Sequence, residues 1–284
     1  MSFESGRHAA SRVGRHGPTS SAPAASDADP VSDEAVAPRE PRKRRARRRA
    51  RVTVGSVFGE IFMTAGILVF GFVGWQVTLA DTVFGTQQAQ SAASAASGYA
   101  SSGVASEPLR TDAPPISERP AEREQVAVMY IPALWGDEGR VVGEGTSRFV
   151  LDSPSLGLAH YAESVMPGDI GNFAVAGHRN GLGGPFTNLN HLAIGDRIYV
   201  QVDDAWMVYE FRNSEYVEPS EVGVVAPVPQ LPEAAAGDRL LTLTTCNPEW
   251  SSVGRLISYA VFVGWSSTGQ PAEFAEDVAA GTSI

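Results

Sequence analysis

Residues 240–257 read LLTLTTCNPEWSSVGRLI, a pattern of two strand-forming runs joined by a turn. The segment Leu240–Thr245 is rich in strand-forming residues and leads directly into Cys246. A turn containing Pro248 follows, and a second run of strand-forming residues begins at Arg255. If the two strands pair as an antiparallel hairpin, the end of the first faces the start of the second. The stretch therefore predicts two neighbouring strands with a thiol and a guanidinium at the same rim.

Cys246 is the single cysteine among the 284 residues. An unpaired thiol in an extracellular domain is exposed to oxidation, so a retained one is a candidate reactive group. The other interpretation is a small buried hydrophobic residue, which free cysteine often is. Arg255 beside the thiol would favour the thiolate and could donate hydrogen bonds to a developing oxyanion, because its planar guanidinium stays charged.

A second titratable side chain follows another apolar segment. Residues 168–181 read GDIGNFAVAGHRNG, in which a predicted strand delivers His178 to its end before a glycine-rich loop. Imidazole titrates near working pH, and a histidine at a strand end next to a loop is placed for proton transfer. A lone histidine is more often structural, so His178 gains weight only together with the cysteine.

The remaining folded part also reads as strands. A strand over Val126–Ile131 stops at Pro132, and the pair Asp203-Asp204 between two strand-forming runs predicts a hairpin. Strands of this length separated by turn residues, with little helical periodicity, indicate an all-β barrel or sandwich with one or two short helices. The runs of strand-forming residues are 126–131, 148–151, 171–176, 196–202, 205–217, 239–245 and 256–264.

Charge divides the chain into two unequal parts. Residues 1–51 carry 12 basic and 6 acidic side chains, a net charge of +6, whereas the remainder carries −16 and the whole chain −10. A nucleic-acid-binding domain would carry the positive field on its folded surface, so this division argues against that class. Residues 1–56 are predicted to form a disordered basic tail in the cytoplasm.

An apolar segment follows the basic run, and residues 61–80 contain no charged side chain. About 20 apolar residues span the roughly 30 Å hydrocarbon core, so residues 57–80 are predicted to form a single transmembrane helix. Basic residues stay on the cytoplasmic side, which puts the N-terminus inside and the chain after Ala80 outside. A cleaved signal peptide is the competing interpretation, but the segment is long for a signal core and begins far from Met1.

The composition also marks the limits of the folded domain. Residues 81–123 are rich in Ser, Ala, Gln and Pro and are predicted to form a flexible extracellular stalk. The folded domain is predicted over residues 124–266. The polar and acidic residues 267–284 are predicted to form a loose tail.

At this point the sequence resembles a known family, the sortases. Residues 242–246, TLTTC, match the sortase TLxTC motif, Arg255 follows at the spacing of the sortase arginine, and residues 176–179, AGHR, resemble the segment with the sortase histidine. The similarity covers about residues 126–264, and its combination of motifs is specific. TTCNP and HRN, with an anchor before the domain, look most like the class E sortases of actinobacteria. The resemblance implies a closed eight-stranded sortase β-barrel.

The resemblance also implies roles for individual residues. Cys246 attacks the threonine carbonyl of a Leu-Ala/Pro-x-Thr-Gly type sorting signal, and His178 protonates the leaving glycine amine. Arg255 holds the substrate and stabilises the oxyanion, while Thr245 and Thr244 contribute to substrate binding. The implied partners are secreted proteins with C-terminal sorting signals and a peptidoglycan precursor amine as acceptor.

The pattern before the histidine strand departs from the family. Residues 157–161 read GLAHY where Gly-x-Gly-His-Tyr is expected, which puts in doubt the assignment of His160 and Tyr161 to the substrate pocket. His160 is also a competing candidate for the acid/base. No His, Cys, Asp or Glu cluster has metal-ligand spacing, so neither a metal nor another cofactor is predicted.

Three functions remain open from the residues alone. A transpeptidase and a membrane-tethered cysteine hydrolase share every catalytic residue and differ in the nucleophile that resolves the thioester. An inactive wall-binding module, with Cys246 as core, would not need Cys, His and Arg each at a strand end. The family resemblance favours the transpeptidase.

Overall fold

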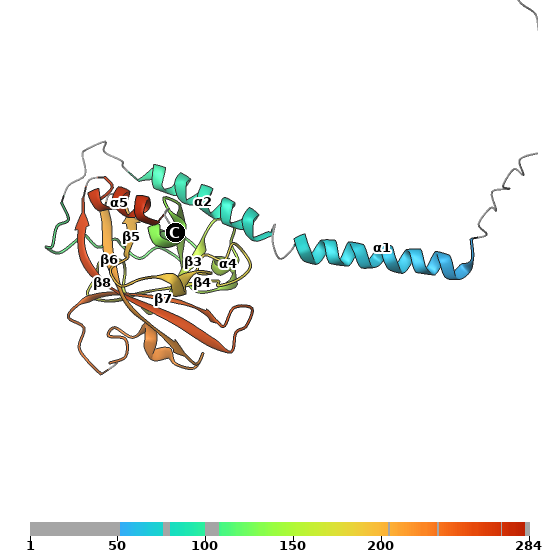
Figure 1. Cartoon of the computed structure of the whole chain (residues 1–284). Helices are drawn as coiled ribbons and strands as arrows, with labels where there is room; N and C mark the ends of the chain where they lie inside the picture. Colours follow the sequence, from blue (N-terminus) through green and yellow to red (C-terminus); the bar gives the residue numbers. More distant parts are fainter. Residues whose placement is uncertain are drawn as a thin grey trace, which may run out of the picture. The chain divides into compact units, whose positions relative to one another are not determined.

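The computed structural model of the chain describes residues 52–75, 80–99, 108–203, 205–231, 233–267 and 269–281. Within these ranges eight strands close into one barrel in the order β1-β2-β3-β4-β7-β8-β6-β5. Figure 1 shows this barrel, with β7 and β8 among its labelled strands. The predicted eight-stranded closed barrel is therefore confirmed. The strands are β1 Gln125–Tyr130, β2 Gly139–Glu144, β3 Gly157–His160, β4 Gly171–Gly177, β5 Arg197–Val202, β6 Ala205–Val217, β7 Arg239–Asn247 and β8 Gly254–Ser266.

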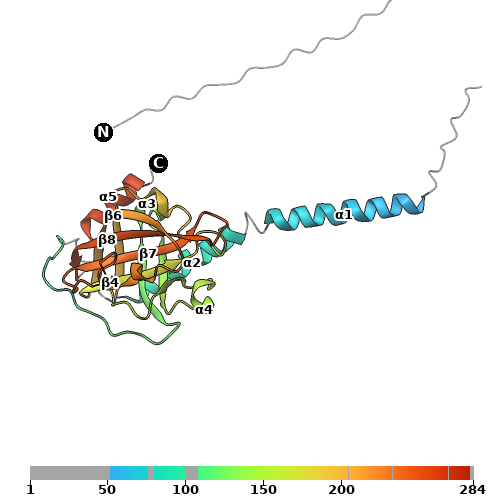
Figure 2. The same ribbon diagram turned by 90° about the horizontal axis from the view of Figure 1, so that it is seen from below.

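The order of the strands brings together the two segments quoted from the sequence. Strand β7 lies between β4 and β8, as Figure 2 also shows, and it runs parallel to β4 and antiparallel to β8. A parallel pair needs a long crossover connection, so β4 and β7 are neighbours despite the 61 residues that separate them in sequence. The predicted hairpin between β5 and β6 is confirmed, with Asp203 in its turn.

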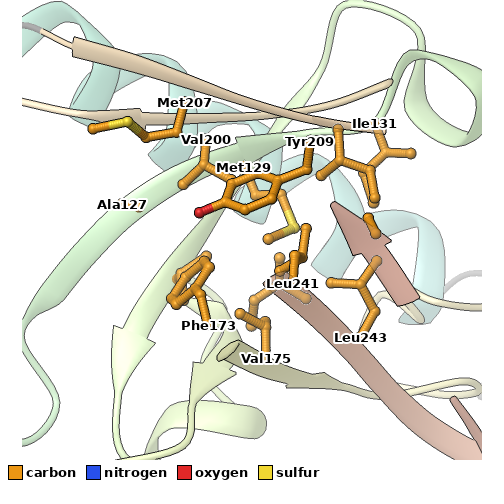
Figure 3. Close-up of a cluster of buried hydrophobic side chains, with 14 of the residues drawn as sticks. Ala127, Met129, Ile131, Phe173, Val175, Val200, Met207, Tyr209, Leu241 and Leu243 are labelled. Carbon is orange, nitrogen blue, oxygen red and sulfur yellow. The ribbon is translucent and has the colours of Figure 1, made fainter. Parts of the chain in front are cut away.

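The inside of the barrel is filled by alternate side chains of the strands. Phe173 and Val175 of β4, and Leu241 and Leu243 of β7, point into the same buried cluster as Tyr209 of β6 (Figure 3). Successive side chains of a strand point to opposite faces. The residues between them, such as Ala176 and Thr244, therefore face outward on β4 and β7.

Short helices join the strands, and one of them corrects a prediction. The structure has α3 Pro132–Trp135, α4 Arg148–Leu151 and the 3₁₀ helices η2 Leu189–His191 and η3 Val222–Val225. Residues 148–151, expected as a strand, form α4 instead, because Ser147 and Arg148 carbonyls accept helical hydrogen bonds and Val150 is buried while Phe149 is exposed. The apolar composition of such a short run cannot separate helix from strand.

The expected flexible stalk over residues 81–123 is corrected where the structure describes it, and residues 100–107 of that prediction lie outside the described residues. Residues Ala80–Gly98 form a helix, α2, which packs on β2 and buries Gln88 and Ala92 completely. Alanine has the highest helix propensity, and small side chains let the helix approach the sheet closely. Farther on, Arg110 pairs with Trp265 of β8, and Arg119 donates a hydrogen bond to Glu144 of β2.

The expected loose tail over residues 267–284 is also corrected. Residues Ala272–Gly281 form helix α5, and Phe274 inserts edge-on against the rings of Tyr130, Tyr199 and Trp206. The segment reads as polar, but this one buried aromatic side chain supplies its packing. The folded domain therefore extends beyond residues 124–266 at both ends.

An apolar helix precedes the domain. Helix α1, Val54–Gly74, begins after Thr53, whose Oγ1 accepts a hydrogen bond from the Ser56 N–H, and none of its residues is buried. Its length and composition suit a membrane span, in agreement with the transmembrane helix predicted over residues 57–80. Residues 76–79 of that prediction, and the basic tail up to residue 51, lie outside the described residues.

Candidate active site

Cys246 and Arg255 are paired across the hairpin of β7 and β8. The register of the two strands sets Cys246 opposite Arg255 and Asn247 opposite Gly254, as the sequence predicted. Both Cys246 and Arg255 are partly exposed, so the thiol is not sealed in the core. Arg255 Nη1 donates hydrogen bonds to the carbonyls of Ser252 and Gly254, at 3.1 and 2.9 Å. These bonds leave Nη2 and Nε of Arg255 as further donors at the rim.

His178 lies one residue beyond β4, on the side of β7 opposite to β8. Strand β4 pairs with β7 so that Ala176 lies beside Thr244, both facing outward. Two residues farther along the same two strands come His178 and Cys246. Because the side-chain direction repeats every two residues, this register brings both to the outer face at the barrel rim. Three residues from distant parts of the sequence thus lie at neighbouring ends of β4, β7 and β8.

Asp152 is a partner of His178 that sequence reasoning missed. Its Oδ1 lies 2.8 Å from His178 Nε2, and its Oδ2 lies 3.3 Å from Nε of Arg148. Asp152 follows α4 directly, so the missed helix is the element that presents it. An Nε2–H that donates to this carboxylate leaves Nδ1 as the ring nitrogen available for proton transfer. The sequence carried no signal for this pair, because the two residues are separated by 26 positions.

Arg179 ties the loop after His178 to the loop after Cys246. Its Nη1 donates to Asn247 Oδ1 at 2.8 Å and its Nη2 to Asn190 Oδ1 at 2.9 Å, and the side chain is buried. The guanidinium therefore holds the residues next to the two expected catalytic groups at a fixed separation. The sequence motifs HRN and TTCNP contain both partners, but only the fold shows that they bond to each other.

The two threonines before Cys246 point in opposite directions. Thr244 Oγ1 lies 3.0 Å from the hydroxyl of Tyr161, so both expected substrate-binding residues share the outward face with Cys246. Thr245 points to the core side and donates from Oγ1 to the carbonyl of Gly177 at 2.8 Å. Thr245 thus fastens β7 to β4 next to His178, and its side chain is buried.

The placement of His160 corrects its assignment to the substrate pocket. Its side chain is 0% exposed, Nδ1 lies 2.6 Å from Glu144 Oε2, and Nε2 lies 2.9 Å from Ser164 Oγ. Burial lowers the pKa of His160, while the hydrogen bond to Glu144 opposes that effect. An enclosed imidazole with both ring nitrogens occupied cannot exchange protons with a substrate. His178, not His160, is the histidine at the rim.

The buried His160 predicts a pH dependence of stability. Burial lowers the pKa of His160, so below pH ~6.5 the unfolded chain protonates this histidine more readily than the folded chain does, and the free energy of unfolding falls as the pH decreases. For a single histidine the slope is at most about 1.4 kcal/mol per pH unit. Urea denaturation between pH 7.5 and pH 5.5 measures this slope, and the slope is expected to decrease in His160→Asn.

The matched control for this prediction is His191→Asn, which changes an exposed histidine on η2. We expect this variant to keep the slope of the unmodified chain. The hydrogen bond with Arg110 lowers the pKa of Asp112, so any contribution of Asp112 to the free energy of unfolding is lost only at more acidic pH. An unchanged slope in His160→Asn would show that His160 does not cause the pH dependence.

Comparison with known proteins agrees with this geometry. The family model of the sortase domain matches residues 129–263. Sortase SrtE1 of Streptomyces coelicolor is 36% identical over 230 residues, which are 78% of this chain and 61% of the relative, so the chain spans less than two thirds of that protein. Sortase SrtE2 of the same organism is 27% identical over 73% of this chain and 81% of its own length.

A solved sortase structure is also similar to this chain. The SrtA sortase from Actinomyces oris is 36% identical, with a TM-score of 0.55 over 58% of this chain and 94% of that chain. The predicted resemblance to the sortases, and to their class E members, is confirmed by these relatives. With its barrel, its Cys246–Arg255 hairpin and its His178 at the adjoining strand end, this chain belongs to the sortase family.

Proposed function

We propose that the chain is a membrane-anchored cysteine transpeptidase that cleaves a Leu-Ala/Pro-x-Thr-Gly type sorting signal between Thr and Gly. The acyl part is transferred to the amine of a peptidoglycan precursor. The observation that carries the proposal is the pairing of Cys246 with Arg255 at the rim where β4 delivers His178. A thiol, an acid/base and an oxyanion donor are the three groups that amide exchange through a thioester requires.

The reaction has two half-reactions that balance in protons. Cys246 Sγ, as the thiolate, attacks the threonine carbonyl, and the C–N bond to glycine breaks as His178 gives its proton to the leaving amine. The acceptor amine then attacks the thioester, loses a proton to His178, and releases the Cys246 thiolate. Arg255 donates to the oxyanion that forms in both steps, through the guanidinium nitrogens that the loop carbonyls leave free.

The outward face of β4 and β7 is the proposed binding surface for the sorting signal. Thr244 and Tyr161 lie on it, and both end in hydroxyl groups that can donate to or accept from an extended peptide. A cavity of about 540 Å³ opens nearby, between the end of β6 and η3, and is lined among others by Tyr216, Val217 and Val224. Val217 pairs with Arg255 on β8, so this cavity adjoins the proposed oxyanion donor.

Asp152 is proposed to orient His178 and to stabilise its protonated form. The substitution Asp152→Asn keeps the shape but removes the charge, and kcat for peptide cleavage is expected to fall roughly 10- to 100-fold. The matched control is Asp137→Asn, which neutralises an exposed carboxylate in the turn after α3. Steady-state kinetics of both variants test the role. A normal kcat in Asp152→Asn would contradict it.

The chain is proposed to lie in the cell membrane as a single-pass protein. Helix α1 would span the bilayer, with the basic tail in the cytoplasm and the barrel outside. The run of arginine and lysine residues before α1 would also be attracted to anionic lipid headgroups. Protease protection in membrane vesicles of known orientation measures this topology.

Product analysis separates transfer from hydrolysis. The full chain in detergent is incubated with a Leu-Ala-x-Thr-Gly peptide, with and without a glycine-based amine acceptor, and the products are identified by mass spectrometry. The proposal predicts the aminolysis product when the amine is present. Hydrolysis alone would favour a membrane-tethered cysteine hydrolase, and no cleavage would favour an inactive wall-binding module.

A further inference from the structure

Helix α2 contains one glutamine that is placed differently from its neighbours. The helix carries Gln87, Gln88 and Gln90, of which Gln87 and Gln90 are exposed and Gln88 is 0% exposed. A buried polar side chain requires hydrogen-bond partners, because burial without them is unfavourable. The hydrogen bonds of the Gln88 amide therefore fix the position of this side chain.

The amide of Gln88 bridges two loops of the barrel. Its Nε2 donates to the carbonyl of Ser153 at 3.3 Å and to the carbonyl of Leu182 at 3.0 Å. Ser153 directly follows Asp152, and Leu182 lies four residues after His178. One NH₂ group thus links the loop that presents the carboxylate to the loop that follows the imidazole.

Two glycines leave the space that this amide occupies. A Cβ added at Gly157 would lie 2.5 Å from Gln88 Nε2, and one added at Gly183 would lie 2.8 Å from Gln88 Oε1. Both glycines have positive φ, at 89° and 87°, a conformation that other residues rarely adopt. A second contact holds the same loop, since Asp81 Oδ1 accepts a hydrogen bond from the Gly183 N–H at 3.4 Å.

The two ends of the Gln88 amide differ in their hydrogen bonding, because only Nε2 has partners among the described residues. Gln88 Oε1 is buried and has no hydrogen-bond partner among the described residues. An apolar side chain of the same length would fill the same space without that unpaired oxygen. What the glutamine adds over such a residue is the pair of hydrogen bonds to the two loops.

We propose that Gln88 is a positioning residue that fixes the relative positions of Asp152 and His178. Helix α2 then belongs to the structure that supports catalysis. This inference rests on the proposed acid/base role of His178. Displacements of about 1 Å in catalytic groups cost on the order of 100-fold in rate, so a bridge between their loops affects turnover more than substrate binding.

The discriminating variant is Gln88→Met in the full chain, because methionine keeps the length and volume and removes both donated bonds. Peptide cleavage is expected to show a kcat reduced about 10-fold or more with a KM changed by less than about threefold. Gln87→Met and Gln90→Met, on the exposed side of the same helix, are the matched controls and are expected to keep the kcat of the unmodified chain. A kcat that falls in all three variants, or in none of them, would overturn the proposal.

Hydrogen–deuterium exchange provides a readout that needs no substrate. In Gln88→Met, exchange is expected to accelerate in peptides covering residues 150–156 and 178–186 and to stay unchanged in β6, with a similar Tm. Unchanged exchange in both loops would overturn the bridge, and faster exchange with a normal kcat would overturn its positioning role. An unmodified chain that cleaves no peptide would contradict the proposed function instead, and the exchange data would then decide on the bridge alone.

Discussion

Cys246→Ala is expected to abolish peptide cleavage, with kcat reduced by at least about 10⁴-fold, because no other thiol is present in the chain to form the thioester. The fold is expected to persist. Cys246 is partly exposed at the end of β7 and alanine fits any strand-end position, so the free energy of unfolding changes by less than about 1 kcal/mol. Cleavage assays and thermal unfolding of the purified full chain measure both effects.

Alkylation of Cys246 in the chain without substitutions is a second test of the same role. Because Cys246 is the only cysteine, alkylation by iodoacetamide modifies a single thiol, and activity is expected to disappear in proportion to the modified fraction. Ser251→Ala removes a hydroxyl from the same loop and is expected to leave cleavage intact. A Cys246→Ala variant that still cleaves the peptide would remove the cysteine mechanism.

Arg255→Lys is expected to reduce kcat by roughly 10²- to 10³-fold, although the charge is retained. The guanidinium of Arg255 uses Nη1 to donate to the carbonyls of Ser252 and Gly254 and can still donate to an oxyanion from its other nitrogens. A lysine ammonium has its three N–H donors on one nitrogen, so it cannot reach both the loop carbonyls and an oxyanion as the planar guanidinium does. The loss should appear in kcat and in kcat/KM, as measured by steady-state cleavage.

The matched control for this substitution is Arg212→Lys. Arg212 lies on β6, is half-exposed and pairs with Glu210, away from the β7–β8 rim. Its substitution is expected to change kcat by less than twofold. Near-normal turnover in Arg255→Lys would show that Arg255 is not the oxyanion donor.

The residues of the rim were predictable because strand ends are local features. The run 240–245 ends at Cys246 and the run 171–176 ends shortly before His178, so the sequence alone put the thiol, the imidazole and Arg255 at strand ends. The hairpin of β7 and β8 follows from chain continuity, whereas the parallel pairing of β4 with β7 depends on the whole barrel. The sequence motifs predicted that His178 lies near Cys246 only through resemblance to a family.

The features that the sequence did not predict depend on a few buried side chains. Helix α2 and helix α5 are polar or alanine-rich and gain stability from a few buried side chains, such as Gln88 and Phe274, which composition does not reveal. The resemblance to the family's Gly-x-Gly-His-Tyr pattern assigned His160 to the substrate pocket, but the alternation of β3 turns it toward the core. Asp152 reaches His178 through a four-residue helix that reads as a strand.

A thioacyl intermediate on Cys246 is detected by the intact mass of the full chain, quenched in acid during turnover of a Leu-Ala-x-Thr-Gly peptide. The proposed mechanism predicts a mass increase equal to the acyl part of the peptide up to its threonine, located on Cys246 by fragmentation and absent from Cys246→Ala. Cleavage of the peptide without this adduct on Cys246, or the same adduct on the Cys246→Ala chain, would contradict it.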